Sequence, residues 1–192
     1  MAVGRGGVMD MTVSTGVADR PASVPGLAVR SIRSDDAAAL QSFHSRLSAD
    51  TVRNRFFAAH PRLSDDEARR FTDLGPGQQA LVATLDHHII GVGRYIRLVS
   101  GDAEVAFVVQ DGYQGHGIGT ELFSLLARIG WDDGVRRFVA DTYADNRAML
   151  DVFMHTPGAV TVMTTRRDGS VIHLVMAVTP PGAVLTWIGD DL

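Results

Sequence analysis

A glycine-rich segment between an apolar run and an amphipathic run constrains the fold of this chain more than any other feature. Residues 111–120 read DGYQGHGIGT and follow the largely apolar run 104–109. The residues after them show the apolar spacing of a helix: Leu122, Leu125, Leu126 and Ile129. Glycines in the turn let successive N–H groups point the same way, and the start of a helix adds unpaired N–H groups and a positive dipole end. The segment therefore predicts an anion-binding site between a strand and a helix.

Two familiar phosphate-binding motifs do not fit this segment. All 18 basic residues are arginine, which excludes the Gly-Lys-Ser/Thr element of a phosphate-loop NTPase. A dinucleotide G-x-G-x-x-G fingerprint from Gly115 would need glycine or alanine at Thr120, and one from Gly112 would need glycine at Gln114. A nicotinamide or flavin cofactor is therefore disfavoured. Glycines also simply connect strands to helices, so the segment alone leaves that explanation open.

Composition bounds the remaining classes. The chain has 192 residues, 45% of them hydrophobic, which suits one domain with a sizeable core. A net charge of -4 argues against a nucleic-acid module, and no apolar run approaches the ~20 residues of a membrane span. The absence of cysteine favours the cytoplasm. His87 and His88 would point to opposite faces of a strand, so we interpret them as a polar turn and expect no metal.

The periodicity predicts one mixed α/β domain over residues 27–179, with a flexible leader at 1–26 and a tail at 180–192. Strands are expected at 27–33, 79–85, 89–98, 104–109, 137–142, 160–165 and 171–178. Helices are expected at 37–47, 49–57, from Ser64 onward, at 117–131 and from a cap at Asp145 to 154. This order fits a sheet with helices on both faces.

The glycine segment also carries a resemblance. Gln114-Gly115-His116-Gly117-Ile118-Gly119 matches the signature Q/R-x-x-G-x-G/A at every defined position, and the chain thereby resembles the GNAT acyltransferase superfamily. The preceding strand, the following helix, a later strand and the segment 144–148 follow in the superfamily order, so the resemblance covers about residues 27–179. It implies a central, twisted, mostly antiparallel sheet of six or seven strands.

Three further segments resemble bacterial protein lysine acetyltransferases, of which this chain would correspond to the catalytic domain only. They are Arg55-Phe56-Phe57, Pro61-Arg62-Leu63-Ser64 and the strand 103–109. This resemblance implies an enzyme that uses acetyl-CoA as donor and a protein lysine as acceptor.

The resemblance also implies where the donor lies. The pyrophosphate would rest on the amides of residues 114–119, with the Thr120 hydroxyl beside them, and the pantetheine arm would pair with the backbone of 107–109. Asn146 would assist the pantetheine arm or an active-centre water, or would simply begin a helix after Asp145. The expected donor-binding residues are Phe107, Val108, Val109, Gln114, Gly115, His116, Gly117, Ile118, Gly119, Thr120 and Asn146. His116 either touches a phosphate or fills a variable position.

Direct transfer to an amine requires a base, because a lysine ammonium has a pKa of about 10.4. Glu104 is the only carboxylate in its apolar strand and matches the strand glutamate that serves as general base in the lysine acetyltransferase subfamily. Burial would raise its pKa, whereas a solvated strand start would not. The resemblance places Phe153 where many members carry a tyrosine that reprotonates the thiolate, and Tyr143 is a substitute or a buried sheet-end residue.

We therefore expect an N-acetyltransferase acting on a primary amine, with a protein lysine as the preferred acceptor, Glu104 and Asn146 in the catalytic centre and no metal. Two alternatives remain open. The acceptor could be a small amine such as an antibiotic, a polyamine or an amino acid. The chain could instead be a sensor that binds acyl-CoA without transferring the acyl group, consistent with phenylalanine at 153.

Overall fold

The computed structural model describes residues 24–60 and 62–180. The predicted leader and tail therefore lie outside the described residues, apart from 24–26 and Pro180. In the described ranges, no helix is both long enough and apolar enough to cross a membrane.

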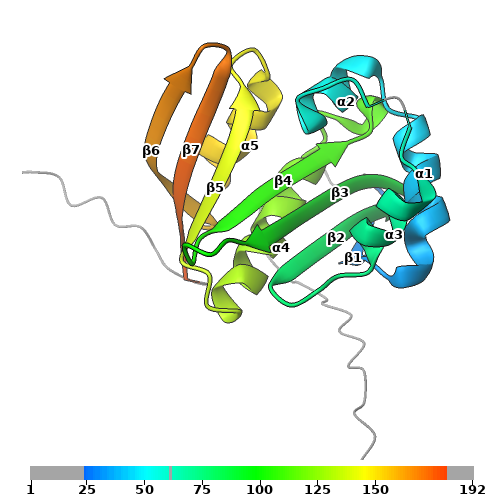
Figure 1. The fold of residues 1–192 in the computed structure, drawn as a ribbon, viewed down its shortest axis with the longest axis horizontal. Helices are drawn as coiled ribbons and strands as arrows, with labels where there is room; N and C mark the ends of the chain where they lie inside the picture. The colour runs from blue at the N-terminus through cyan, green and yellow to red at the C-terminus, as the bar shows by residue number, and fades with distance from the viewer. Residues whose placement is uncertain (1–23, 61, 181–192) are drawn as a thin grey trace, which may run out of the picture.

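The described part of the chain forms a seven-stranded sheet and five α-helices, as the periodicity predicted (Figure 1). The strands are β1 (Ala28–Ser31), β2 (Gln78–Leu85), β3 (His88–Arg97), β4 (Ala103–Val109), β5 (Arg137–Tyr143), β6 (Val160–Asp168) and β7 (Val171–Val178). The α-helices are α1 (Ala37–Ser45), α2 (Ala49–Phe56), α3 (Asp65–Thr72), α4 (Ile118–Asp132) and α5 (Arg147–His155), with short 3-10 helices η1 (Ser34–Asp36) and η2 (Asp111–Tyr113).

The strand order across the sheet is β1-β2-β3-β4-β5-β7-β6. Every neighbouring pair is antiparallel except β4 and β5 at the centre, which are parallel. Antiparallel neighbours follow from the hairpins β2-β3, β3-β4 and β6-β7, whereas the one parallel pair needs the crossover that α4 supplies. The expectation of a mostly antiparallel mixed sheet is confirmed.

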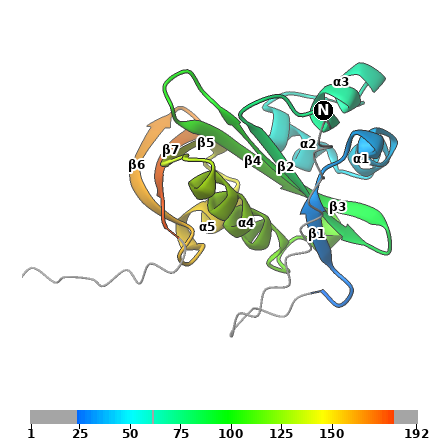
Figure 2. The ribbon, with the colours of Figure 1, turned by 90° about the horizontal axis from the view of Figure 1, so that it is seen from below.

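Helices cover the two faces of the sheet unequally. The helices α4 and α5 lie on one face, over a core that includes Phe107, Leu122, Phe123, Phe138 and Phe153. The helices α1 and α3 lie on the other face, over a smaller core around Leu40, Phe43 and Val82 (Figure 2). On that second face, β5, β7 and β6 have no helix in front of them (Figure 1).

Local signals explain several element boundaries, and one expected helix cap was wrong. Ser64 and Glu67 form the capping box that begins α3. Asp86 and His87 adopt left-handed conformations in the β2–β3 turn, where a polar turn was expected.

Asp145, however, does not cap α5. The cap is Asn146, whose side-chain oxygen accepts a hydrogen bond from the Met149 N–H at 3.2 Å.

Candidate active site

The centre of the sheet opens between β4 and β5. β4 pairs with β3 along its whole length, but it pairs with β5 only at Ala103 (with Phe138) and Glu104 (with Val139). β5 meanwhile stays paired with β7 from end to end. Because two fully paired half-sheets share only this short parallel contact, they separate beyond Glu104. Figure 1 shows β4 and β5 running apart. One edge of β4 is therefore left without a strand partner.

The hydrogen-bonding pattern determines which backbone groups of β4 face that opening. The Gln110 N–H donates to a β3 carbonyl at 2.9 Å. In an antiparallel pair, residues alternate between hydrogen-bonding to the partner and pointing away from it. Val108 therefore directs its N–H and C=O toward β3, and Val105, Phe107 and Val109 direct theirs toward the opening. An extended ligand lying in the opening would meet these groups as a strand meets its neighbour.

The glycine loop at the mouth of the opening presents free backbone N–H groups. Gly115 and Gly117 both have φ of 77°, a left-handed conformation that glycine adopts without a Cβ clash. Gly117 is the N-cap of α4, and the first bond of the helix runs from the Glu121 N–H to the Gly117 carbonyl (2.9 Å). The N–H groups of 118–120 therefore have no acceptor within the helix. Together with the helix dipole, these N–H groups are suited to binding an anion.

Side chains hold this loop against α2 and β4. The Asp111 carboxylate accepts hydrogen bonds from the Ser48 N–H (2.9 Å), the Ser48 hydroxyl (2.6 Å) and the Thr51 hydroxyl (2.7 Å). Gln114 Nε2 donates to the Val109 carbonyl (2.9 Å) and to Thr51 Oγ1 (3.2 Å). Partial burial opposes ionisation of Asp111, but the hydrogen bonds from Ser48 and Thr51 prevail and keep the pKa of its carboxyl below the ordinary value. We name these side-chain contacts among Asp111, Ser48, Thr51 and Gln114 the loop latch.

Two expected donor residues are engaged within the protein. The Gln114 N–H donates to the Asp111 carbonyl at 3.2 Å, so this amide is already occupied. His116 is exposed, and its Nδ1 lies 2.9 Å from the Gln114 carbonyl oxygen. The anion site is therefore formed by the amides that follow Gln114, and Gln114 itself shapes the loop.

The opening, the loop and α5 together enclose a groove of about 490 Å³. Every expected donor-binding residue except His116 lines it. Its walls are Thr51, Asn54, Arg55, Phe107, Val108, Val109, Tyr113, Gln114, Gly115, Gly117, Ile118, Gly119, Thr120, Asn146, Ala148, Met149, Asp151, Val152 and His155. The unpaired backbone groups of β4 lie along the groove, and the free amides of the glycine loop lie at its mouth. This combination suits an extended ligand with an amide-containing arm and a terminal pyrophosphate, such as a coenzyme A thioester.

The comparison with protein families agrees with this geometry. Residues 27–156 match the model of the acetyltransferase (GNAT) domain. The chain belongs to the GNAT acetyltransferase family. The matched domain is therefore an acyl-CoA N-acyltransferase domain, with acetyl-CoA as its acyl donor.

Individual GNAT proteins are similar to different extents. The chain is 43% identical over 82 residues to acetyltransferase Pat of Mycolicibacterium smegmatis, covering 43% of this chain and 23% of that protein. It is 28% identical over 130 residues to acetyltransferase PA5475 of Pseudomonas aeruginosa, covering 65% of this chain and 70% of that protein. The chain thus spans less than a quarter of the mycobacterial relative.

Solved structures share the GNAT fold. The GNAT domain of S. lividans PAT has a TM-score of 0.70 and 34% identity, over 78% of this chain and 89% of that one. The yncA acetyltransferase of Salmonella typhimurium, solved with acetyl-CoA, has a TM-score of 0.64 at 16% identity, over 82% of this chain and 96% of that one. The latter likeness concerns the fold alone.

Within this GNAT domain, Glu104 lies at the closed end of the opening. It is the last residue of β4 that is paired with β5. Its neighbours Val105 and Phe107 belong to the core under α4, so alternation places the Glu104 side chain on the α2 face of the sheet. Its charge there raises the pKa of both Arg55 and Arg94, against the larger lowering effect of burial. The Glu104 side chain is exposed, so the burial considered from the sequence does not occur.

Phe153, for which the resemblance implied a position that often carries tyrosine, is apolar and buried. Phe153 is 2% exposed, with ring centroids 5.2 Å from Phe107 and 5.6 Å from Phe123. Tyr143 is partly exposed and not buried: its ring lies 4.9 Å from that of Phe57, and the Arg53 guanidinium lies 4.2 Å above it. Phe153 offers no proton to a departing thiolate.

Proposed function

We propose that this GNAT domain acetylates the ε-amine of a protein lysine. The support is the resemblance of three segments to bacterial protein lysine acetyltransferases, together with the similarity to acetyltransferase Pat and to the S. lividans PAT domain. The observation that carries the proposal is the opening between β4 and β5, with free amides at its mouth and Glu104 at its closed end. A sheet face without helices in front of it, formed by β5, β7 and β6, lies beside that end (Figure 1), and in this proposal the acceptor polypeptide approaches over it.

In this proposal each part of the groove has one task. The amides of residues 115–120 hold the pyrophosphate of the donor, and the backbone groups of Phe107 and Val109 hold its pantetheine arm. Asn146 uses its side-chain oxygen for the helix cap, which leaves the amide hydrogens to donate to the donor arm or to a water. The donor supplies a thioester carbonyl that an amine can attack. The chain itself supplies position and proton transfer.

Glu104 is the proposed general base. One proton passes from the lysine ammonium to the Glu104 carboxylate, directly or through a water, and the neutral nitrogen then forms a bond to the carbonyl carbon. The carbon–sulfur bond breaks, and the nitrogen releases its second proton to solvent. The sulfur leaves as a thiolate, which needs no full protonation because a thiol has a pKa of about 8.5. The absence of a proton donor at Phe153 is therefore compatible with turnover.

A thiol-release assay tests this proposal with little background. The chain contains no cysteine, so with acceptors that lack cysteine a thiol reagent detects only free coenzyme A. It also contains no lysine, so an acetyl-lysine signal comes only from the acceptor. We expect turnover with lysine-containing proteins or peptides and a loss of about 10²–10⁴-fold in kcat for Glu104→Gln. Coenzyme A affinity should stay unchanged in that variant, measured by calorimetry.

The acceptor panel should also contain antibiotics, polyamines and free amino acids. Turnover with these compounds alone would show that the acceptor is a small amine and not a protein lysine. Calorimetric binding of acetyl-CoA without thiol release from any acceptor, at several pH values, would favour the non-catalytic sensor for which Phe153 is the motivating residue. Equal rates for the parent and Glu104→Gln would remove Glu104 from the mechanism.

A further inference from the structure

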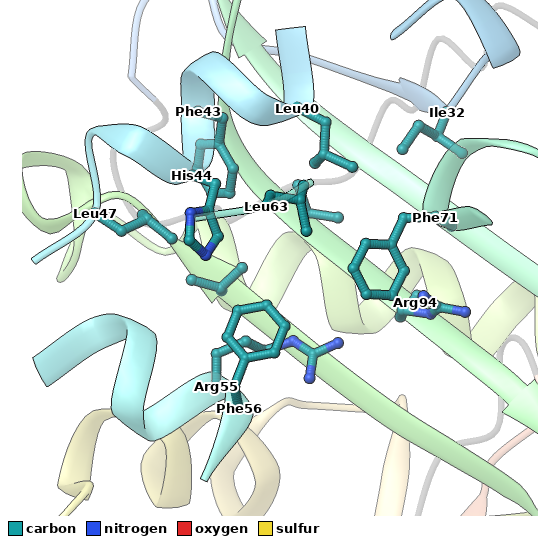
Figure 3. Close-up of a pocket in the computed structure, with 13 residues that line it drawn as sticks. Ile32, Leu40, Phe43, His44, Leu47, Arg55, Phe56, Leu63, Phe71 and Arg94 are labelled. Carbon is teal, nitrogen blue, oxygen red and sulfur yellow. The ribbon is translucent and has the colours of Figure 1, made fainter. Parts of the chain in front are cut away.

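A second cavity lies on the other face of the sheet, beneath α1, α2 and α3. It has a volume of about 50 Å³ (Figure 3). Its walls are mostly apolar: Ile32, Leu40, Phe43, Leu47, Phe56, Leu63, Phe71, Ala80, Val92 and Val108, with the polar residues His44, Arg55 and Arg94. Figure 3 shows Arg55 and Arg94 on the same side of the cavity, across from Leu40 and Phe43. Two arginines in an apolar cavity require an explanation, because burying a cation without a counterion is costly.

The arginine charges are only partly compensated within the described residues. Burial, and then the charge of Arg94, lowers the pKa of Arg55 to about 10, while Glu104 acts in the opposite direction. Burial likewise lowers the pKa of Arg94, again opposed by Glu104. Neither guanidinium has a carboxylate of the described chain within the 4.0 Å of an ion pair. Two cations therefore face one carboxylate, and the site keeps a net positive charge.

The geometry of Arg94 shows unused hydrogen-bonding capacity. Its Nε atom is buried and has no hydrogen-bond partner among the described residues. Aromatic rings hold both guanidiniums in place, since Arg94 lies 5.0 Å from the ring centre of Phe71 and Arg55 lies 5.2 Å from that of Phe56. A fixed guanidinium with a free N–H matches a carboxylate better than a mobile one would.

The cavity adjoins the donor groove. Arg55 and Val108 line both spaces, so a group in the cavity lies next to the arm of the donor. A buried water needs about 10–15 Å³ of cavity volume, so a cavity of about 50 Å³ holds roughly three to five heavy atoms. A carboxylate with one or two attached carbons fits that volume, and the apolar walls suit the carbons.

We propose that Arg55 and Arg94 bind a carboxylate of the acceptor and so select amines that carry a nearby negative charge. This inference rests on the proposed N-acetyltransferase function. The carboxylate has two possible sources: the side chain of an aspartate or glutamate beside the target lysine, or the carboxylate of a free amino acid. Both present the same chemistry to the two guanidiniums.

Matched acceptors test the proposal without any variant. One pair consists of lysine peptides that differ only by glutamate or glutamine beside the lysine, and the other consists of alanine and alaninamide. We expect the parent to favour the carboxylate member of at least one pair by about 10-fold to 100-fold in kcat/KM, measured by thiol release. The pair that shows the preference identifies the source.

Variants then assign the preference to the arginines. In Arg94→Gln and in Arg55→Gln, the ratio of kcat/KM for the carboxylate acceptor to kcat/KM for its uncharged partner should move toward one. Arg128→Gln, an exposed arginine on α4 on the opposite face, should keep the parent ratio. Circular dichroism establishes that each variant is folded.

The outcomes separate the two proposals. Thiol release with equal kcat/KM for both members of both pairs would overturn the carboxylate subsite and leave the N-acetyltransferase intact. A preference that survives in both arginine variants would also overturn the subsite. No thiol release from any acceptor would overturn both proposals together.

Discussion

Gly115→Ala isolates the backbone conformation on which the anion site depends. A Cβ built at Gly115 would meet nothing within 4 Å, so the substitution creates no clash with the protein. Its φ of 77° is nevertheless unfavourable for alanine, by about 1–2 kcal/mol. Gly112 is the matched control in the same loop, because its Cβ would also meet nothing within 4 Å and its φ lies outside the left-handed region. The two alanine variants should therefore differ by the backbone term alone.

The backbone strain of Gly115→Ala can appear in either of two measured quantities. If the loop keeps its shape, the free energy of unfolding falls by about 1–2 kcal/mol, which lowers Tm by roughly 2–8 °C for a domain of this size. If the loop relaxes to an unstrained conformation, the free energy of unfolding is unchanged. Coenzyme A then binds about 5-fold to 30-fold more weakly, because the loop must return to the strained conformation to bind it.

Thermal unfolding and calorimetry with coenzyme A measure both losses in one preparation. Their sum should be about 1–2 kcal/mol larger for Gly115→Ala than for Gly112→Ala. Identical behaviour of the two variants in both assays would refute the argument that the left-handed turn creates the site. A loss of affinity well beyond 30-fold would mean that the new methyl group also meets the phosphate.

Two further predictions concern the loop latch and the buried aromatic cluster. Because hydrogen bonds lower the pKa of Asp111, its carboxylate stabilises the fold above the ordinary pKa near 4, and this contribution is lost as pH falls through the lower folded value. Urea unfolding should therefore show a deficit for Asp111→Asn at pH 7 that shrinks in acid, and a constant deficit would contradict this. Phe153→Tyr should lose about 1–3 kcal/mol of stability by burying a hydroxyl without raising kcat. A faster variant would show that position 153 reaches the leaving sulfur.

The sequence predicted the elements well where the signal was local. Apolar periodicity located the strands and helices, and the glycines at 115 and 117 marked the turn in which the structure shows positive φ. Local signals also had a limit. Asp145 and Asn146 are adjacent residues that both favour a helix cap. The structure uses Asn146, and the sequence offers no local signal that separates the two.

Contacts between distant segments could not be predicted. Ser48 and Thr51 precede Asp111 by about 60 residues, and no pattern in the sequence links a helix start to a carboxylate in a later loop. The same holds for Arg55 and Arg94, which come from α2 and β3 and meet only because α2 packs over the sheet. The exposure of Glu104 likewise depends on tertiary structure, because its side chain lies on the sheet face where β5, β7 and β6 have no helix in front of them.

The helix α2 connects the two halves of the site. Thr51 and Arg55 stand four residues apart and so share one face of this eight-residue helix. The Thr51 hydroxyl donates a hydrogen bond to Asp111 in the glycine loop. Arg55 lines both the groove for the acyl donor and the second cavity. Because the two residues share this face, the loop latch that fixes Thr51 also helps to set where the Arg55 guanidinium lies. The placement of the proposed acceptor subsite therefore depends on the same hydrogen bonds that shape the donor site.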